Sequence, residues 1–485
     1  MKADIGLIGL AVMGQNLVLN IDDHGFSVAV YNRSPEVTEK FLAGSAAGRP
    51  GILGAHSLEE LVLSLARPRK VMLLIKAGEA VDETIGRLVP LLETGDCVID
   101  GGNSNFEDTV RRARELAARG LLFVGSGLSG GEEGARHGPS LMPGGDVAAW
   151  PLIRPIFEAI AARTASGESC CAWMGPEGAG HFVKMVHNGI EYGDMELIAE
   201  TYQLLRDAYS LKPGAMAEAF TAWNRTELDS YLVEITAVIL AAKDSDGSPL
   251  VDKILDAAGQ KGTGKWASQA ALDAGVPLTL ISEAVFARAL SALVDERRAA
   301  APKLKGPVTP VALRPATPMA LDDLRKALLA AKIVSYAQGF MLMREVGSER
   351  GWNLDHGAIA RTWRGGCIIR SVFLDRIKEA FDRNAALPCL LIDPYFAGLL
   401  ADCQSSLRRV VSLAAESGIP VPALMAALAF YDGYRCSRLP ANLLQAQRDY
   451  FGAHTYERTD RPRGEFHHTD WTGSGGSATS RAYNA

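Results

Sequence analysis

Long apolar runs, clustered cysteine ligands and an excess of basic charge are all missing from this sequence of 485 residues. The seven cysteines include no Cys-x-x-Cys spacing, so we expect reduced, structural thiols rather than a disulfide framework. Fifty Lys and Arg residues against fifty-six Asp and Glu give a net charge of -6, which creates no field that attracts nucleic acid or an anionic membrane. Any bound phosphate must therefore be held by a local cluster of cations.

The chain also lacks the patterns of an exported or membrane protein. No apolar run approaches the roughly 20 residues that span a bilayer, and Met1–Asp4 leads into a strand pattern without a signal peptide. We therefore expect a cytoplasmic location. With 48% hydrophobic residues, the chain can bury a large core and is too long for one ordinary domain, so two or more domains are expected.

The first third of the chain alternates short apolar segments with amphipathic segments of helical length. This alternation predicts an α/β fold over residues 1–177, with a Rossmann-type, doubly wound parallel sheet. The predicted strands are Ile5–Leu10, Ser27–Tyr31, Val71–Ile75, Cys97–Asp100, Leu121–Val124 and Cys171–Met174.

Residues 178–435 have a different pattern, with long periodic segments rich in Ala, Leu, Glu and Arg and no β-branched runs between them. This pattern predicts a large all-helical domain. The chain becomes polar after Cys436, and from Tyr456 onward it is rich in Gly, Ser, Thr and Arg. Taken alone, this composition predicts that residues 436–485 end in a flexible tail.

A glycine-rich turn follows the first predicted strand and precedes a helix predicted over Gln15–Asp23. Such a turn brings backbone N–H groups and the positive end of the helix to a dinucleotide pyrophosphate. The spacing reads G-x-A-x-x-G, with Ala11 at the second position of the usual fingerprint, so a purely structural turn is the alternative. The predicted cofactor residues are Gly9, Leu10, Ala11, Val12, Met13 and Gly14.

The second predicted strand is followed by Asn32, Arg33 and Ser34, where an NAD enzyme would place an Asp or Glu. A guanidinium and a hydroxyl suit a 2'-phosphate, whereas a carboxylate would repel it, so NADP is favoured over NAD. Two further turns lie at carboxyl ends of predicted strands, where open α/β sheets bind ligands, although either could be a helix cap. They contain Ile75, Lys76 and Ala77, and Asn103.

The segment 178–194 contains Lys184, His187, Asn188 and Glu191. In a helix, this spacing places a base, an acid and two hydrogen-bonding groups within an arc of roughly 100°. The opposite side is apolar with two glycines that would let another backbone approach, which predicts a half-buried catalytic helix. The alternative is a solvated face with a Glu–Lys pair. The apolar side comprises Phe182, Val186, Gly189, Ile190, Gly193 and Leu197.

Other segments offer groups for an anion, although each is also compatible with an ordinary loop or surface role. Ser129, Gly130 and Gly131 follow a predicted strand, and consecutive glycines can expose N–H groups as an anion nest. The cations in distinctive contexts are Lys261, Arg288, Arg448 and, if protonated, His454.

Together these segments closely resemble the decarboxylating 6-phosphogluconate dehydrogenases of the pentose phosphate pathway, along nearly the whole chain. The motifs are GLAVMGQNL, DGGNS, SGGEEGAR, GPSLMPGG, GHFVKMVHNGIEYGDM, GQKGTGKW, SEAVFARALS, WRGGCIIRS and QAQRDYFGAHTYE. The resemblance implies a homodimer with a tail that reaches the partner subunit, which overrules the flexible-tail prediction for Arg448 and His454. Ser34 stands where Thr is usual, and His137 replaces a Tyr.

The resemblance implies that 6-phosphogluconate is oxidised and decarboxylated with NADP as the cofactor and without a metal. Lys184 then matches the general base at the sugar 3-hydroxyl, and Glu191 matches the acid that protonates the enediol. Substrate-binding positions are matched by Asn103, Ser129, Gly130, Gly131, His187, Asn188, Tyr192, Lys261, Arg288, Arg448 and His454. Asn103 also matches the coenzyme site, with residues 9–14, 32–34 and 75–77.

Two other functions are compatible with parts of this sequence. A related β-hydroxyacid dehydrogenase with a short unphosphorylated substrate would need neither the phosphate-end cations nor the C-terminal tail. A non-catalytic NADP-binding sensor would not need Lys184 and Glu191 on one helical face. Both are less consistent with the sequence than the decarboxylating enzyme.

Overall fold

The structure of the protein is a computed structural model, which describes residues 2–260, 262–307, 315–473, 475 and 479. By its internal packing the chain divides into two units, Met1–Leu428 and Ala429–Ala485. Among the described residues, no helix combines the length and the apolar character needed to cross a membrane.

The first part of the larger unit is a seven-stranded sheet in the order β3-β2-β1-β4-β5-β6-β7. Its first six strands run parallel, in the order of a dinucleotide-binding sheet, and β7 pairs antiparallel with β6. The predicted doubly wound sheet is therefore confirmed. The strands are β1 Ile5–Ile8, β2 Val28–Tyr31, β3 Ile52–Gly54, β4 Lys70–Leu73, β5 Cys97–Asp100, β6 Leu122–Ser129 and β7 Ser140–Gly145.

Each inner strand supplies side chains to both faces of the sheet, because successive residues of a strand point in opposite directions. In β1, Leu7 joins one buried cluster and Ile8 joins the other. Burial on both faces explains the continuous apolar runs that predicted these strands. One face is covered by α1 Val12–Asp23, α2 Pro35–Ala43 and α7 Trp150–Ile160, and the other by α3 Leu58–Leu63, α4 Glu79–Leu88 and α5 Phe106–Ala117.

The sequence prediction of the sheet was wrong at three places. Cys171–Met174 is not a strand, because Cys171 forms only an isolated bridge to Leu141 beside β7. Strands β3 and β7 were missed. β3 has only three residues, and β7 contains Pro143 and two glycines, which a strand tolerates at a sheet edge.

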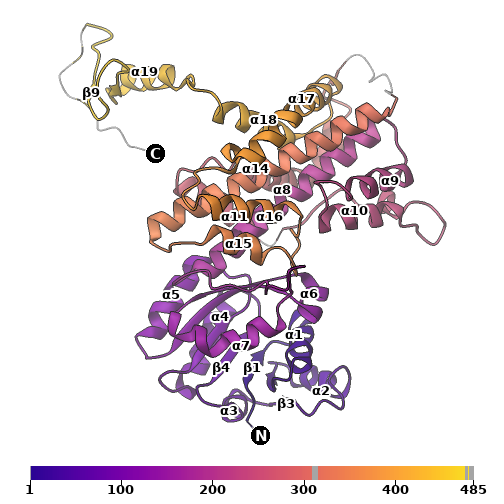
Figure 1. The fold of residues 1–485 in the computed structure, drawn as a ribbon, viewed down its shortest axis with the longest axis vertical. Helices are drawn as coiled ribbons and strands as arrows, with labels where there is room; N and C mark the ends of the chain where they lie inside the picture. Colours follow the sequence, from indigo (N-terminus) through magenta and orange to yellow (C-terminus); the bar gives the residue numbers. More distant parts are fainter. Residues whose placement is uncertain (1, 261, 308–314, 474, 476–478, 480–485) are drawn as a thin grey trace. The chain divides into compact units, whose positions relative to one another are not determined.

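The second part of the larger unit is helical, as predicted, and is organised around two long helices, α8 Ala179–Asp207 and α14 Pro318–Arg350, which pack side by side (Figure 1). The first turns of α8 also contact β6 and β7, so this helix links the sheet to the helical part. The other helices of this part are α9 Pro213–Trp223, α10 Tyr231–Ala241, α11 Thr263–Asp273, α12 Thr279–Ser291, α13 Val294–Ala300, α15 His356–Thr362, α16 Phe373–Arg383 and α17 Pro394–Ser417. Helix α6 Gly131–His137 contacts α1 in the sheet part, and α18 Pro422–Tyr434 spans the boundary between the two units in the sequence.

The smaller unit contains α19 Ala441–Gly452 and a two-stranded antiparallel sheet of β8 Tyr456–Glu457 and β9 Phe466–His467. The composition-based prediction of a flexible tail was therefore wrong for this part of the chain. Asp449, which is fully buried, organises the segment by accepting hydrogen bonds from the backbone of Thr455 and Thr469 and from the Trp471 indole. One carboxylate thus compensates for the scarcity of apolar residues.

Candidate active site

A cavity of about 560 Å3 opens where strands β1, β2, β4 and β5 end. Parallel strands bring their carboxyl ends to one edge, so turns far apart in the sequence meet there. Ten of the predicted cofactor residues line this cavity, namely Gly9, Ala11, Met13, Gly14, Asn32, Arg33, Ser34, Ile75, Lys76 and Asn103. Leu10, Val12 and Ala77 are not among its lining residues.

The turn after β1 has the backbone that a dinucleotide needs. Gly9 has a φ of 107°, where an L side chain is strained, and a Cβ there would collide with the Leu74 carbonyl. The Leu10 N–H is held by the Asn32 side chain at 3.1 Å, which joins the turns after β1 and β2. The start of α1 therefore faces the cavity with its positive end, which suits a pyrophosphate.

The charges of the cavity suit a coenzyme with an additional phosphate. Arg33 and Lys76 line it, together with Arg87 from α4, a cation that the sequence analysis missed. Arg87 was missed because it lies on a helix rather than in a strand-end turn. The spacing of Ala80, Glu83, Thr84 and Arg87 along one helical face could have identified it.

Helix α8 carries the predicted catalytic stripe, and its burial excludes the solvated-face alternative. Lys184, His187 and Asn188 are 5%, 0% and 8% exposed, and Glu191 is partly buried. On the opposite side, the atoms nearest to the two glycines belong to side chains of neighbouring helices rather than to another backbone. There, Cβ atoms added at the two glycines would press against α11, α12 and α14, at Ala267, Ile281, Leu280 and Ser335.

Lys184 lies directly against β6, because Gly127 has no side chain. A Cβ at Gly127 would overlap the Cβ and Cγ of Lys184, so only glycine allows this contact. The resulting burial lowers the pKa of Lys184 from 10.5 to about 8, and the nearby Glu191 charge opposes this effect. A lysine in this environment can be neutral near physiological pH and can act as a base.

His187 joins the stripe to the loop after β6. Its Nε2 lies 3.3 Å from Ser129 Oγ, and its Nδ1 lies 3.0 Å from Asn188 Oδ1 and 3.4 Å from Lys184 Nζ. Burial, followed by the charge of Lys184, lowers the pKa of His187 well below 6.5, so the imidazole is neutral. A neutral imidazole can donate at one nitrogen and accept at the other, which suits hydroxyl groups of a sugar.

Gly130 and Gly131 continue from Ser129 with φ values of 115° and 62°, at the start of α6. Two successive residues with positive φ are restricted to glycine in practice, so the sequence pattern has a backbone reason. Asn103 and Leu128 line the coenzyme cavity, and Leu128 directly precedes Ser129. The coenzyme cavity and the buried stripe of α8 are therefore adjacent.

Trp363 and Cys367 belong to this region but were not predicted as site residues. The fully buried Trp363 ring contacts the His187 ring edge-on at 5.6 Å. Burial raises the pKa of the Cys367 thiol to about 12, so the thiol stays protonated. Both come from the WRGGCIIRS segment, which has no charge periodicity that points to a site.

Tyr192 and Arg288, two of the predicted substrate residues, lie against each other. The Arg288 guanidinium lies 3.6 Å from the centroid of the Tyr192 ring, in cation–π geometry. Lys261 lies outside the described residues. Arg448 and His454 belong to the smaller unit and are described only within it, where Arg448 donates to Gln445 Oε1 at 3.1 Å. Among the described residues no group of three His, Cys, Asp or Glu side chains could hold a metal.

Comparison with known proteins gives matches along the entire chain. Residues 4–175 match the NAD binding domain of 6-phosphogluconate dehydrogenase, and residues 180–471 match the C-terminal domain of 6-phosphogluconate dehydrogenase. Decarboxylating 6-phosphogluconate dehydrogenases of Mus musculus and Haemophilus influenzae are 60% and 58% identical, covering 100% of this chain and 100% and 99% of their own.

A solved structure of Plasmodium falciparum 6-phosphogluconate dehydrogenase has a TM-score of 0.91 and 44% identity. It covers 96% of this chain and 100% of its own, and it was determined in apo form, with its cofactor NADP+ and with its substrate 6-phosphogluconate. With both halves of the chain matched and relatives at such identity over their full length, the chain belongs to the 6-phosphogluconate dehydrogenase family.

Proposed function

We propose that this chain oxidises 6-phospho-D-gluconate to D-ribulose 5-phosphate and CO2, with reduction of NADP to NADPH. The observation that carries the proposal is a buried lysine with a pKa of about 8, adjacent to a dinucleotide cavity that contains Arg33. A short unphosphorylated hydroxy acid would not need Arg288 beside the substrate region. Relatives named as decarboxylating 6-phosphogluconate dehydrogenases match the chain end to end.

NADP fits the residues of the cavity. Gly9 and the start of α1 would hold its pyrophosphate, Arg33 and Ser34 its 2'-phosphate, and Asn103 the end nearest the substrate. When bound, NADP supplies the hydride acceptor. The chain itself must orient the substrate C3 toward the cavity and manage two proton transfers.

Lys184 is the first proton acceptor. Its neutral Nζ takes the proton of the 3-hydroxyl as hydride leaves C3, and burial makes that neutral form accessible near pH 7. His187, Asn188 and Ser129 hold the hydroxyl groups around the reacting carbon. The C3 ketone oxygen then accepts the electron pair of the breaking bond to the carboxylate, so CO2 leaves and an enediolate remains.

Glu191 completes the reaction by protonating the carbon that becomes C1 of the product. It lies two helical turns after Lys184 on the same face of α8, so one rigid helix positions base and acid. Tyr192 and Arg288, with Lys261, form the phosphate end of the substrate site. Arg448 and His454 complete this end from the tail of a partner subunit.

The decisive experiment mixes purified protein with NADP and 6-phosphogluconate, without metal, and follows NADPH and CO2 together. Equal amounts of both products support the proposal. NADPH without CO2 would identify a simple hydroxyacid dehydrogenase, and bound NADP without either product would identify a sensor. Lys184→Ala should bind NADP yet form no NADPH, and near-normal formation would remove Lys184 as the base.

The proposed assembly is a cytoplasmic homodimer of subunits with a coenzyme domain over 1–177, a helical domain over 178–435 and a tail over 436–485. Coexpression of Lys184→Ala and Arg448→Ala chains tests the tail. In a mixed dimer, one site keeps both wild-type groups only if the tail crosses between subunits. Random pairing should then restore about a quarter of wild-type activity, because half the dimers are mixed with one intact site each. No restoration would place the tail at its own subunit.

A further inference from the structure

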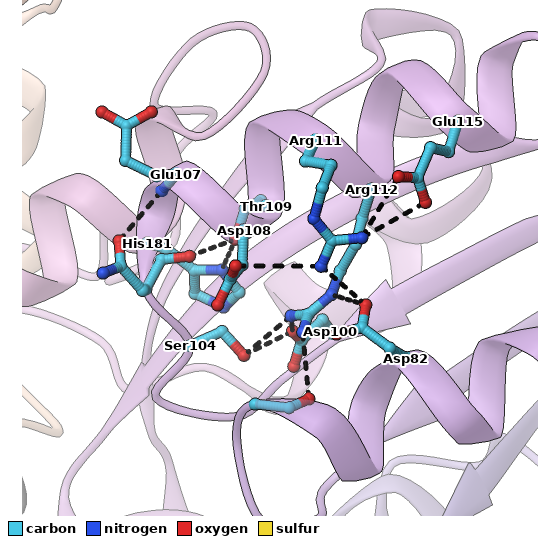
Figure 2. Close-up of polar contacts among 12 residues, drawn as sticks. Asp82, Asp100, Ser104, Glu107, Asp108, Thr109, Arg111, Arg112, Glu115 and His181 are labelled. Carbon is cyan, nitrogen blue, oxygen red and sulfur yellow. Dashed lines mark hydrogen bonds and ion pairs between the residues drawn. The ribbon is translucent and has the colours of Figure 1, made fainter.

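Arg112 is a buried arginine on α5 that lies behind the coenzyme cavity and does not line it. Its side chain is 1% exposed, and its guanidinium lies between two segments of the chain, residues 78–82 and 100–104 (Figure 2). It donates to both carboxylate oxygens of Asp82 at 2.8 and 3.0 Å and to the Gly78 carbonyl at 3.0 Å. Its remaining contacts are Asp100 Oδ2 at 3.3 Å and Ser104 Oγ at 3.4 Å. All five guanidinium donors are thus used.

One set of these contacts fixes the turn that carries Asn103. The buried Asp100 carboxylate accepts from the Gly102 N–H at 3.0 Å and from Ser104 Oγ at 2.6 Å. The residues immediately before and after Asn103 are therefore both held by one carboxylate. Arg112 contacts both Asp100 and Ser104, so it joins the hydrogen-bond network that surrounds Asn103.

The other set of contacts fixes the wall formed by α4. Gly78 directly follows the turn of residues 75–77, and Asp82 lies in the first turn of α4. Asp82 faces Arg112, whose hydrogen bonds are the largest cause that lowers the Asp82 pKa to about 2. The opposite side of the same helix lines the cavity through Ala80, Glu83, Thr84 and Arg87.

The neighbouring arginine provides a natural comparison. Arg111 also pairs with Asp82, at 2.9 Å, and has a second partner in Glu115. It is 44% exposed, and its ion-pair partners Asp82, Asp108 and Glu115 lie outside the Asn103 turn. Exposed pairs of this kind contribute little to stability. Of these two arginines, Arg112 is the one that connects both strand-end turns.

Helix α5 has a further fixed point toward the catalytic helix. Thr109 Oγ1 lies 2.7 Å from Nδ1 of the buried His181, which precedes Lys184 by three residues on α8. Figure 2 shows His181 beside Thr109 on the helix that carries Arg112. The helix that carries Arg112 is thus anchored independently, so its guanidinium can act as a rigid brace.

We propose that Arg112 is a positioning residue for the coenzyme, which holds the Asn103 turn and the α4 wall in the geometry that binds the dinucleotide. This inference rests on the proposed function, since it takes the cavity as the coenzyme site. Arg112 and Arg33 then have different roles. Arg112 supports turns that would contact NAD and NADP alike, whereas Arg33 lies at the position of the 2'-phosphate, which only NADP has.

The test compares Arg112→Lys with Arg111→Lys in the full-length protein, with NADP affinity titrated directly and circular dichroism to verify folding. Lysine cannot reproduce the fork, so charge-assisted hydrogen bonds to the turns are lost, and the Kd for NADP should rise about tenfold. The ratio of kcat/KM for NADP to that for NAD should stay unchanged. Arg111→Lys should bind NADP as wild type does.

Ser104→Ala provides a milder variant if Arg112→Lys does not fold, and its Kd for NADP should rise about threefold, as expected for one lost hydrogen bond. A folded Arg112→Lys protein with wild-type affinity would overturn the inference. An equal loss of NADP affinity in Arg111→Lys would also overturn it. If Arg112→Lys does not fold, an unchanged Kd for NADP in Ser104→Ala would overturn it. If the wild-type protein itself fails to bind NADP, the proposed function is refuted instead.

Discussion

Two buried lysines on neighbouring helices should respond in opposite ways to the same substitution. Lys184 on α8 is 5% exposed, and its Nζ lies 3.4 Å from His187 Nδ1. Lys332 on α14 is 0% exposed and forms an ion pair with Asp194 at 2.5 Å. We predict that Lys184→Met stabilises the protein while abolishing turnover, and that Lys332→Met destabilises it.

The magnitude for Lys184 follows from its pKa. Folding with a pKa of about 8 instead of 10.5 costs about 3 kcal/mol at pH 7, at about 1.36 kcal/mol for each factor of ten in proton affinity. Methionine keeps the methylenes against Gly127 and removes this cost. Breaking the buried Lys332 pair leaves Asp194 as an uncompensated charge, which costs about 3–5 kcal/mol.

The pH dependence adds a signature. Because the pKa of Lys184 is lower in the folded state, the unfolded chain binds more protons between about pH 8 and pH 10.5, and the wild-type protein gains stability across that window. The advantage of Lys184→Met should therefore shrink by about 1 kcal/mol between pH 7 and pH 9.

Urea unfolding at a fixed protein concentration measures these differences for wild type and both variants. A Lys184→Met protein that is less stable than wild type at pH 7 would refute the argument that burying the charged Lys184 ammonium costs folding free energy. An advantage that is the same at pH 7 and pH 9 would also refute it, because simple packing gains do not titrate.

Three further predictions concern catalysis, coenzyme choice and the tail. The rate of NADPH formation in a single turnover should rise through about pH 8 as Lys184 loses its proton, and Glu191→Gln should move this limb to lower pH because the Glu191 charge favours protonated Lys184. Arg33→Ala should raise KM for NADP about tenfold with little effect on NAD, and an unchanged preference would remove Arg33 from the 2'-phosphate site. Asp449→Asn should increase hydrogen exchange across 455–471, since an amide has only one oxygen to accept the hydrogen bonds that the two carboxylate oxygens accept, whereas Asp460→Asn at an exposed position should not.

Much of the coenzyme half could be predicted because its signals are local. Strand-end turns meet at one edge of a parallel sheet, so the sequence alone predicts that Gly9, Asn32 and Lys76 lie at the same edge. Edge strand β7 was missed because the prediction used only local signals. Pro143 and two glycines give no strand signal by themselves. The pairing of β7 depends on β6, which the local sequence does not reveal.

The sequence by itself determined the stripe of α8, because helical periodicity alone places Lys184, His187 and Glu191 on one face. Only the tertiary structure decided that this face is buried, with Lys184 against Gly127. This burial lowers the pKa of Lys184 from 10.5 to about 8, so that the lysine can act as a base. The tertiary structure also decided the contacts of Arg112, whose partners lie up to 34 residues away. Burial and long-range hydrogen bonds arise from packing between segments, and no local pattern encodes them.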